Sequence, residues 1–174
     1  MNAARLTFCI LLAAFGWIVL AALGRFARAA ESEWEYACRA GTTTAFYLGR
    51  ALRSGQANFD GRYEYDAASG TISKPNGIHL DITTPVGSYA ANGWGLYDMV
   101  GNVFEWCQDW YGPYPAGSVT DPQGPVTGPS RVIRCGCWCL SAWWCRSAFR
   151  DANSTPDNLN GDYGLRVVLA PDRP

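Results

Sequence analysis

The chain has 174 residues, the length of one ordinary domain, and a formal net charge of -1, which gives no support to nucleic acid as a partner. Its single histidine nearly excludes a multi-histidine iron or zinc site. Eight tryptophans, nine tyrosines and nineteen glycines, beside 17% charged residues, predict a loop-rich fold held together by aromatic side chains.

The chain begins with an apolar run over residues 6–24, flanked by Arg5 and Arg25. Its 19 residues are just long enough to span a bilayer as a helix. The run also resembles a secretory signal, because residues 27–29 read Ala-Arg-Ala, a pattern typical of a cleavage site. We therefore expect a membrane-anchored or exported protein, in the periplasm or at the cell surface, that contacts a membrane only through residues 6–24.

Seven cysteines are present, one of them in the apolar run. The other six are Cys38, Cys107, Cys135, Cys137, Cys139 and Cys145. An odd number cannot all pair within one chain, although the six would form disulfides if the domain is exported. The alternative is that they are small buried apolar side chains.

The first predicted element after this run is a short helix over residues 31–40. Trp34, Ala37 and Cys38 would share one of its faces, which is the face expected to be buried. Gly41 follows as the predicted C-cap, because glycine readily takes the left-handed conformation that ends helices.

The rest of the chain predicts strands and loops. Residues 42–93 carry turn residues every few positions, so only short strands fit between them. Residues 102–106 are predicted as a strand, and residues 112–130, rich in proline and glycine, as a loop. Three closing strands are expected at residues 131–133, 143–149 and 163–169.

Four segments carry longer motifs. Residues 31–42 read Glu-Ser-Glu-Trp-Glu-Tyr-Ala-Cys-Arg-Ala-Gly-Thr, and residues 95–106 read Gly-Leu-Tyr-Asp-Met-Val-Gly-Asn-Val-Phe-Glu-Trp. The other two are residues 131–138, Arg-Val-Ile-Arg-Cys-Gly-Cys-Trp, and the closing segment 155–168. Together they resemble the formylglycine-generating enzyme (sulfatase-modifying factor) family. The resemblance implies an α+β, C-type-lectin-like fold with little regular secondary structure.

The resemblance covers residues 31–170 and has no counterpart of the family's N-terminal half. We therefore expect an N-terminally truncated, partial domain over residues 31–174, after a hydrophobic segment over residues 1–30. A frameshift or a wrong start codon would produce the same pattern, and residues 1–30 would then be an artefact of a cytoplasmic protein. Signal, anchor and artefact all stay open.

The resemblance also implies structural calcium. Asn102, the Val103 carbonyl and Glu105 offer the hard oxygen ligands that Ca²⁺ prefers. Asn58 resembles a family position that contributes to a second calcium site. The alternatives are a capping asparagine with a carboxylate bound to backbone amides, and an ordinary turn at Asn58.

The activity that the resemblance implies is a copper-dependent oxidation. Formylglycine-generating enzymes use two cysteines to bind Cu(I) and hold a sulfatase cysteine, which O₂ then oxidises to an aldehyde; soft thiolates suit Cu(I). The candidates here are Cys139 and Cys145. Counted from Cys137, Cys145 falls on the second family position and Cys139 lies one residue from the first; counted back from residues 146–150, Cys145 no longer matches. Counting from Cys137 puts Leu140 at the first position, and the shortened segment resembles relatives that lack the pair. We therefore predict that the standard oxidase pair is absent.

The same segment implies a ligand-binding cleft. In the family it lines the central cleft, so exposed members here would contact a peptide or a sugar. The residues concerned are Cys137, Trp138, Trp143, Trp144 and Arg146. The alternation of Cys135, Cys137 and Cys139 would place three thiols on one strand face, able to hold a soft metal, or simply buried. Arg166 enters an apolar strand and is expected to pair with a buried carboxylate.

Two functions remain. The first is a copper-dependent oxidase whose partner is a sulfatase-like protein or peptide. The second is a noncatalytic, lectin-like module that binds a protein or a surface ligand. The placement of Cys139 relative to Cys145 discriminates between them, because only sulfurs that lie close together can share one Cu(I).

Overall fold

The computed structural model describes residues 26–152, 155 and 160–169. Its elements are β1 (Phe26–Arg28), α1 (Glu31–Arg39), β2 (Ala51–Leu52), β3 (Glu64–Asp66), β4 (Thr71–Ser73), β5 (Phe104–Trp110), β6 (Arg131–Arg134), the 3-10 helix η2 (Ala142–Cys145), β7 (Tyr163–Leu165) and β8 (Val167–Leu169). Among the described residues the strands form three small sheets. The expected α+β architecture with little regular secondary structure is therefore confirmed.

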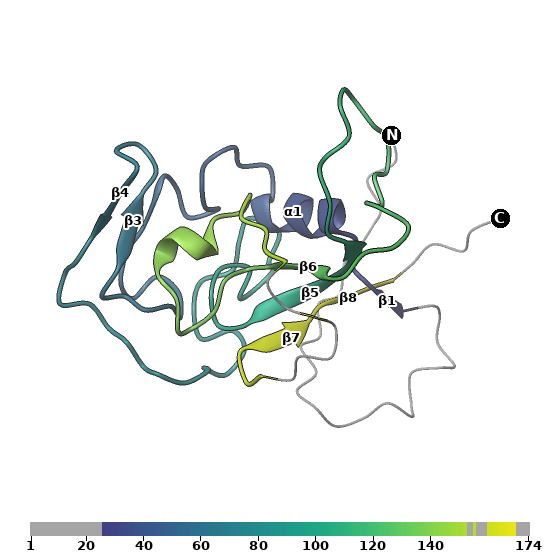
Figure 1. The fold of residues 1–174 in the computed structure, drawn as a ribbon. Helices are drawn as coiled ribbons and strands as arrows, with labels where there is room; N and C mark the ends of the chain where they lie inside the picture. The colour runs from purple at the N-terminus through teal and green to yellow at the C-terminus, as the bar shows by residue number, and fades with distance from the viewer. Residues whose placement is uncertain (1–25, 153–154, 156–159, 170–174) are drawn as a thin grey trace.

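The central sheet has the strand order β6–β5–β7. β5 runs antiparallel to β6 and parallel to β7, with Glu105 opposite both Arg134 and Gly164. Helix α1 lies against β5 and β6 (Figure 1). In this topology the end of β6 and the start of β7 both lie beside the start of β5. The turn after β6 and the residue before β7 are thereby brought together.

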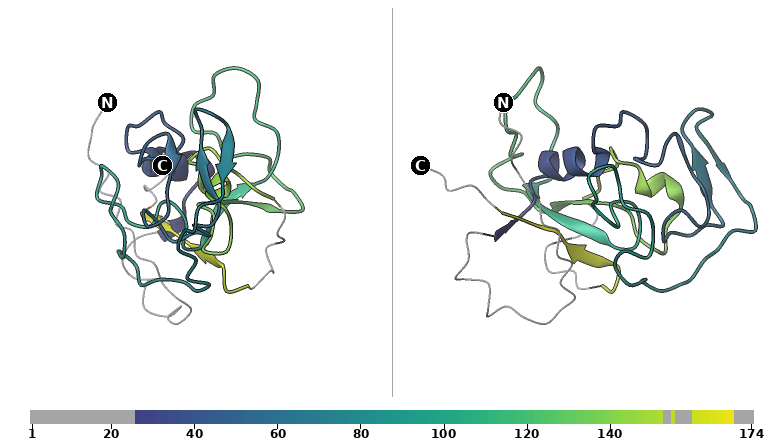
Figure 2. Two further views of the ribbon diagram at one scale, coloured as in Figure 1. Left: turned by 90° about the vertical axis from the view of Figure 1, so that its left-hand side faces the viewer. Right: turned by 180° about the vertical axis from the view of Figure 1, so that it is seen from behind.

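The two other sheets lie at opposite ends of the molecule. The hairpin of β3 and β4, with β2 at its side, occupies one end, and the β1–β8 pair occupies the other (Figure 2). Buried apolar side chains gather under α1, beneath the β2–β3 pair, and around the start of β5. The third of these clusters supplies the floor of the site described below.

Helix α1 buries the face that the sequence predicts. Trp34 and Cys38 are fully buried, and Ala37 is half-buried. At the start of the helix, the Glu33 carboxylate accepts a hydrogen bond of 3.0 Å from the N–H of Ala30. This is one half of a capping box, and it fixes where the helix begins.

The end of α1 differs from the prediction by one residue. The C-cap is Ala40 rather than Gly41: Ala40 takes the left-handed conformation with φ of 45°, and Gly41 follows with φ of 87°. The N–H of Ala40 donates to the Tyr36 carbonyl at 3.2 Å, which satisfies one of the last helical carbonyls. A non-glycine residue in this conformation carries a steric cost.

Residues 143–149 do not form the predicted strand. The chain turns into η2 instead, where the N–H of Trp144 donates to the Ser141 carbonyl at 3.1 Å. Trp143 and Trp144 both pack edge-on against Phe149, with ring centroids 5.3 and 5.0 Å away. A strand would point two neighbouring side chains to opposite faces, so this shared packing requires the helical turn.

The predicted strand over residues 163–169 is split into two at Arg166. β7 pairs with β5, and β8 leaves that sheet to pair with β1. The Arg166 side chain turns inward, and its two nitrogens donate to the Glu105 carboxylate at 2.6 and 2.8 Å. The expected pairing of Arg166 with a buried carboxylate is confirmed.

Strand β1 precedes Glu31, where we expected the domain to begin. Its antiparallel pairing with β8 and the burial of Ala29 make residues 26–30 part of the packed domain. The apolar run over residues 6–24 lies outside the described residues. Within the described part of the chain, no helix is both long and apolar enough to cross a bilayer.

Candidate functional site

Cys137, Cys139 and Asp162 meet at the N-terminal end of β5. The sulfurs of Cys137 and Cys139 are 2.8 Å apart, and the Cys139 sulfur lies 3.9 Å from a carboxylate oxygen of Asp162. All three candidate ligand atoms lie within 4.8 Å of one another. Cys137 is fully buried, whereas Cys139 and Asp162 are half-buried. We call these three residues the thiol cluster.

Hydrogen bonds from other segments hold the backbone of this cluster in place. The N–H of Trp138 donates to the Asn102 carbonyl at 2.9 Å, and the Leu140 carbonyl accepts from Asp60 at 2.9 Å. The Asp162 carbonyl accepts from the N–H of Phe104 at 2.8 Å. The cluster is therefore positioned by fixed backbone rather than by a free loop.

Half-buried aromatic side chains surround the thiol cluster. Tyr163 stacks on Trp106 at 5.4 Å and on Phe104 at 5.7 Å between ring centroids. The floor consists of buried Phe104, Ile133 and Phe149, and the half-buried rim consists of Trp106, Leu140, Trp143, Trp144 and Tyr163. We call the latter five the aromatic rim. Such a surface combines apolar contact area with the polar edges of indole and phenol groups.

Cys145 is packed away from solvent. Its residue is 1% exposed, and its sulfur lies 3.9 Å from the Ser141 carbonyl. A β-carbon placed on Gly136 would come within 2.5 Å of this sulfur, so no space remains on that side. Cys145 belongs to the buried cluster beneath β2 and β3, whereas Cys139 lies on the rim of the cluster at the start of β5.

Cys135 does not share a face with Cys137 and Cys139, in contrast to the alternation expected from the sequence. β6 ends at Arg134, and Cys135 and Gly136 both take positive φ, of 87° and 76°. The Cys135 sulfur turns inward to the carbonyls of Asp98 and Gly101, at 3.3 and 3.1 Å. Only two of the three thiols therefore face the aromatic rim.

Burial sets the protonation of these thiols. Desolvation raises the pKa of Cys137, Cys139 and Cys145 above the usual value, because a thiolate is poorly stabilised away from water. Without a bound cation the three side chains are therefore neutral thiols at neutral pH. A metal ion has to displace their protons in order to bind.

Asn102 and Asn58 lie side by side, as the calcium prediction requires, but their amides are occupied by protein groups. The Asn102 side-chain oxygen accepts from the Asn58 amide at 3.1 Å and from the N–H of Thr84 at 2.9 Å. The Asn102 amide donates back to the Thr84 carbonyl at 3.2 Å. These hydrogen bonds connect the three loops that contain Asn58, Thr84 and Asn102.

Glu105, the carboxylate of the predicted calcium set, is also fully engaged. One oxygen accepts from the Trp34 indole at 2.6 Å and from Arg166, and the other accepts from Arg166. Ca²⁺ binds carboxylate oxygens directly, but here the Arg166 guanidinium and the Trp34 indole already occupy both oxygens of Glu105. The side chains of Asn58, Asn102 and Glu105 are therefore occupied by protein groups in this arrangement, and calcium binding at these residues and the Val103 carbonyl stays a prediction.

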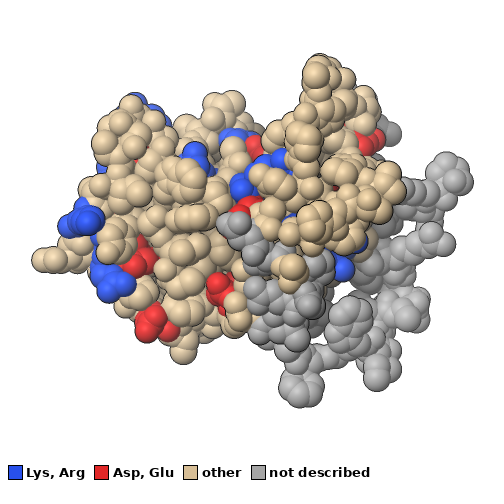
Figure 3. Space-filling view, in the orientation of Figure 1, with Lys and Arg blue, Asp and Glu red and all other residues tan. Residues whose placement is uncertain are grey.

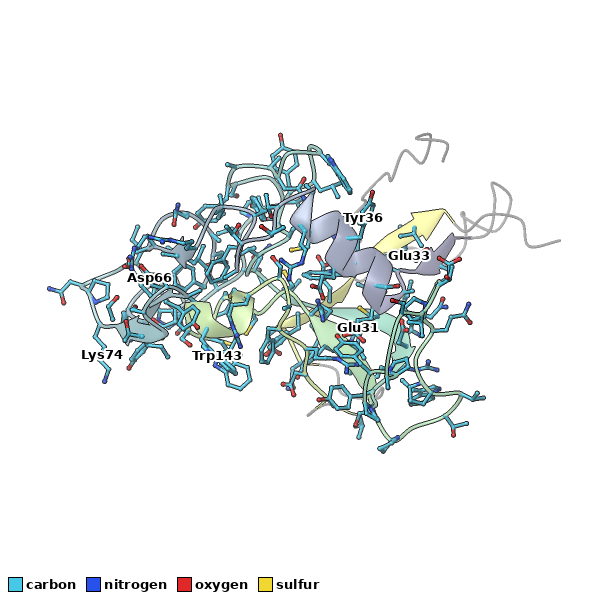
Figure 4. All side chains as sticks on the ribbon, turned by 90° about the horizontal axis from the view of Figure 1, so that it is seen from above. Glu31, Glu33, Tyr36, Asp66, Lys74 and Trp143 are labelled. Carbon is cyan, nitrogen blue, oxygen red and sulfur yellow. The ribbon has the colours of Figure 1, made fainter. Side chains whose placement is uncertain are left out.

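The remaining cleft candidates are half-buried, and they face other elements. Trp138 stacks on His79, with ring centroids 6.4 Å apart. Arg146 lies 4.1 Å above the Trp143 ring, and its Nε donates to the Trp143 carbonyl at 2.8 Å. Figure 4 shows Trp143 beside the hairpin that carries Asp66 and Lys74, away from Glu31 on α1.

A hollow that the sequence did not predict lies between α1 and the loop over residues 112–130. It has a volume of about 510 Å³, and Tyr36, Tyr114, Arg150 and several prolines line it. Its only sequence signal was the proline-rich loop, since the spacing of these residues along the chain does not indicate that they meet. Across the face shown in Figure 3, basic and acidic side chains are interspersed.

The Glu31 carboxylate accepts hydrogen bonds from several side chains around this hollow. This carboxylate accepts from Arg134 at 2.9 Å, from Arg150 at 2.7 Å and from the Tyr114 hydroxyl at 2.9 Å. The Arg150 guanidinium also lies 4.2 Å from the Tyr114 ring centre, a cation–π contact. The charges of Glu31 and Arg150 in this hollow are therefore paired within the protein.

Comparison with known proteins adds the following findings. A family model described as "Sulfatase-modifying factor enzyme 1-like domain" matches residues 21–171. The formylglycine-generating enzyme of Streptomyces coelicolor is 40% identical over 147 residues, covering 79% of this chain and 45% of that protein. The serine/threonine-protein kinase pkn1 of Chlamydia caviae is 41% identical over 143 residues, covering 79% of this chain and 20% of that protein.

Among solved structures, the Treponema denticola variable protein 1 is similar, with a TM-score of 0.63 and 30% sequence identity. The match covers 84% of this chain and 48% of that one. The chain spans between a fifth and a half of the length of the curated relatives it matches. The fold implied by the sequence motifs is confirmed by these matches.

Proposed function

Because this chain belongs to the sulfatase-modifying factor family, we propose that it is a noncatalytic member which binds a protein or peptide segment at the aromatic rim. In this proposal Cys139 and Cys145 do not act as the thiol pair that copper-dependent oxidation of a sulfatase cysteine requires. Two separate points carry the proposal: the burial of Cys145 argues against oxidation, and the half-buried rim provides the binding surface.

The burial of Cys145 is the observation that carries the noncatalytic assignment. A Cu(I) ion that takes a substrate thiol as a ligand needs protein sulfurs that a peptide can approach. Cys145 is 1% exposed and packed against Gly136, whereas Cys139 is in contact with Cys137. Cys139 and Cys145 therefore do not present a pair of sulfurs to an incoming cysteine.

Two of the similar proteins have names that do not refer to formylglycine chemistry. One curated match at 41% identity is named a protein kinase, and this stretch is a fifth of its length. A solved structure at 30% identity is named a variable protein. Domains of this family thus occur in proteins whose names carry no formylglycine chemistry.

The aromatic rim supplies the surface for recognition. Trp106, Trp143, Trp144 and Tyr163 are half-buried and rest on a rigid apolar floor. Rigid aromatic side chains give a large contact area at low cost in conformational entropy, and tryptophan and tyrosine dominate protein interfaces for this reason. A peptide laid on this face would also lie over Cys139.

A labelled Cys-x-Pro-x-Arg peptide tests binding and oxidation in one experiment. Fluorescence anisotropy measures its binding, and mass spectrometry detects conversion of its cysteine to formylglycine in the presence of Cu(I) and O₂. We expect binding without conversion. The Trp144→Ala variant should bind at least about tenfold more weakly, as loss of an interface tryptophan typically does.

Trp94→Ala is the matched control, because Trp94 is 48% exposed and packs against Tyr36 instead of the rim. It should bind the peptide as the unchanged protein does. Conversion of the peptide cysteine would overturn the noncatalytic assignment. Equal loss of binding in the Trp144→Ala and Trp94→Ala variants would show that the peptide does not bind specifically at the aromatic rim.

A further inference from the structure

We infer that Cys137, Cys139 and Asp162 form a binding site for a zinc ion. This site shares Cys139 with the predicted copper pair but uses Cys137 and Asp162 in place of Cys145, and it shares no residue with the predicted calcium set. It also stands apart from the proposed peptide binding, since it needs no peptide. The inference rests on geometry, on the chemistry of the donors and on the fixed backbone around them.

The geometry matches one tetrahedral ion. With Zn–S bonds of about 2.3 Å and Zn–O bonds of about 2.0–2.2 Å, two sulfurs lie about 3.8 Å apart and a sulfur and an oxygen about 3.5 Å. The Cys137–Cys139 distance is 2.8 Å and the Cys139–Asp162 distance is 3.9 Å. To bind the ion, the two sulfurs move apart by about 1 Å and the Asp162 oxygen moves about 0.4 Å closer to the Cys139 sulfur.

The donor set favours Zn²⁺ over softer and harder ions. Two thiolates exclude Ca²⁺ and Mg²⁺, which take oxygen ligands. The Asp162 carboxylate, as third ligand, is a poor partner for Cu(I) but a regular partner for Zn²⁺. Two thiolates and a carboxylate carry three negative charges, which one Zn²⁺ largely neutralises within the apolar floor.

The backbone around the three ligands is already in place. Cys137 and Cys139 lie in a turn anchored to Asn102 through Trp138, and Asp162 is anchored to Phe104. Three ligands held in position lower the entropy lost on binding. Since Cys139 and Asp162 are half-buried, the fourth position faces outward and takes a water molecule.

Binding should depend on pH with a defined sign. Zn²⁺ binds thiolates rather than thiols, so each ion that binds displaces thiol protons into solution. Acidification therefore weakens binding, and a rise in pH strengthens it. Proton release measured by calorimetry in buffers of different ionisation enthalpy gives the number of thiols involved.

The test uses the full chain, reduced and freed of metal. Zn²⁺ affinity is measured by competition with a chromogenic chelator, and Co²⁺ is used as a spectroscopic probe, since sulfur-to-cobalt charge transfer reports thiolate ligation. We expect one ion per chain and a tetrahedral cobalt spectrum. Cys139→Ser and Asp162→Asn should each lower the affinity at least about tenfold.

Two control variants sharpen the outcome. Asp121→Asn removes an exposed carboxylate in the loop over residues 112–130, and Cys145→Ala removes a thiol outside the cluster; neither should change the affinity. Binding that depends on Cys145 but not on Asp162 would overturn the inference, and so would the absence of one-to-one binding. Because Asp162→Asn keeps the size and shape of the side chain, it keeps the test decisive if Cys139→Ser does not fold.

Discussion

Glu105 and Arg166 form an ion pair in the interior, where neither side chain is more than 3% exposed. The Glu105→Gln substitution would leave the Arg166 guanidinium buried without a full counter-charge. We expect it to lower the free energy of unfolding by about 3–5 kcal/mol, as is typical when one partner of a buried pair is removed. Urea denaturation followed by circular dichroism measures this change.

Glu64→Gln is the control for that substitution. Glu64 pairs with Arg53 at 3.3 Å, and the Arg53 side chain is 47% exposed. Solvent screening limits such a surface pair to less than about 1 kcal/mol. Similar losses in the two variants would mean that Glu105 does not hold the centre of the sheet.

Gly136 packs directly against the Cys145 sulfur. This close packing can be tested by comparison with Gly95, a second glycine of the same backbone conformation. Gly136 and Gly95 have φ of 76° and 77°, but only the β-carbon added at Gly136 meets atoms within 4 Å. Gly95→Ala should cost about 1–2 kcal/mol, the usual penalty for the left-handed conformation. Gly136→Ala should cost distinctly more, because its methyl group overlaps the Cys145 sulfur.

The melting temperatures of the two alanine variants give the comparison directly. A larger drop for Gly136→Ala is the expected result. If the two variants had the same melting temperature, the space beside the Cys145 sulfur would be larger than the structure shows. The noncatalytic assignment would then lose its support.

At the scale of elements, the end of α1 offers a stabilising change. Ala40 takes the left-handed conformation with φ of 45°, where glycine is favoured. Ala40→Gly should therefore stabilise the protein by up to about 1 kcal/mol. Ala37→Gly, within the helix, should destabilise it by about 1 kcal/mol. Thermal unfolding of both variants checks the opposite signs, and two destabilised variants would contradict the assigned helix end.

The sequence was sufficient for elements that depend on local pattern. The buried face of the helix over residues 31–39 and the strand over residues 131–134 follow from apolar spacing. Arg166 was correctly expected to find a buried carboxylate, because an arginine within an apolar strand has to be neutralised. Its partner could not be named, since Glu105 lies 61 residues away in the chain.

Elements shaped by tertiary packing could not be predicted. Trp143 to Phe149 reads as a strand, but the packing of two adjacent tryptophans on Phe149 selects a 3-10 turn. The alternation of cysteines likewise predicts one face, but the positive φ of Cys135 turns its thiol away from the others. The periodicity of a short sequence segment does not indicate where tertiary packing replaces a strand with a turn or changes the direction of a side chain.

At the scale of the whole molecule, topology assembles the candidate site. β5 lies between β6 and β7, so the turn after β6 and the residue before β7 both reach its first residue. Cys137 and Cys139 thereby meet Asp162, 23 residues beyond Cys139. The family motifs imply a cleft in this segment, and Asp162 lies in the closing motif at residues 155–168, but the sequence does not indicate that its carboxylate meets the two cysteines.

The measurement that tests the central claim most directly is site-resolved labelling of the cysteines in the native, reduced, metal-free protein. Iodoacetamide treatment followed by peptide mass spectrometry gives a rate for each thiol. The account predicts that Cys139 is alkylated while the protein is folded, and that Cys145 reacts only after denaturation, because it is 1% exposed. Comparable native rates for Cys139 and Cys145 would contradict it, since both sulfurs would then be available to copper and substrate.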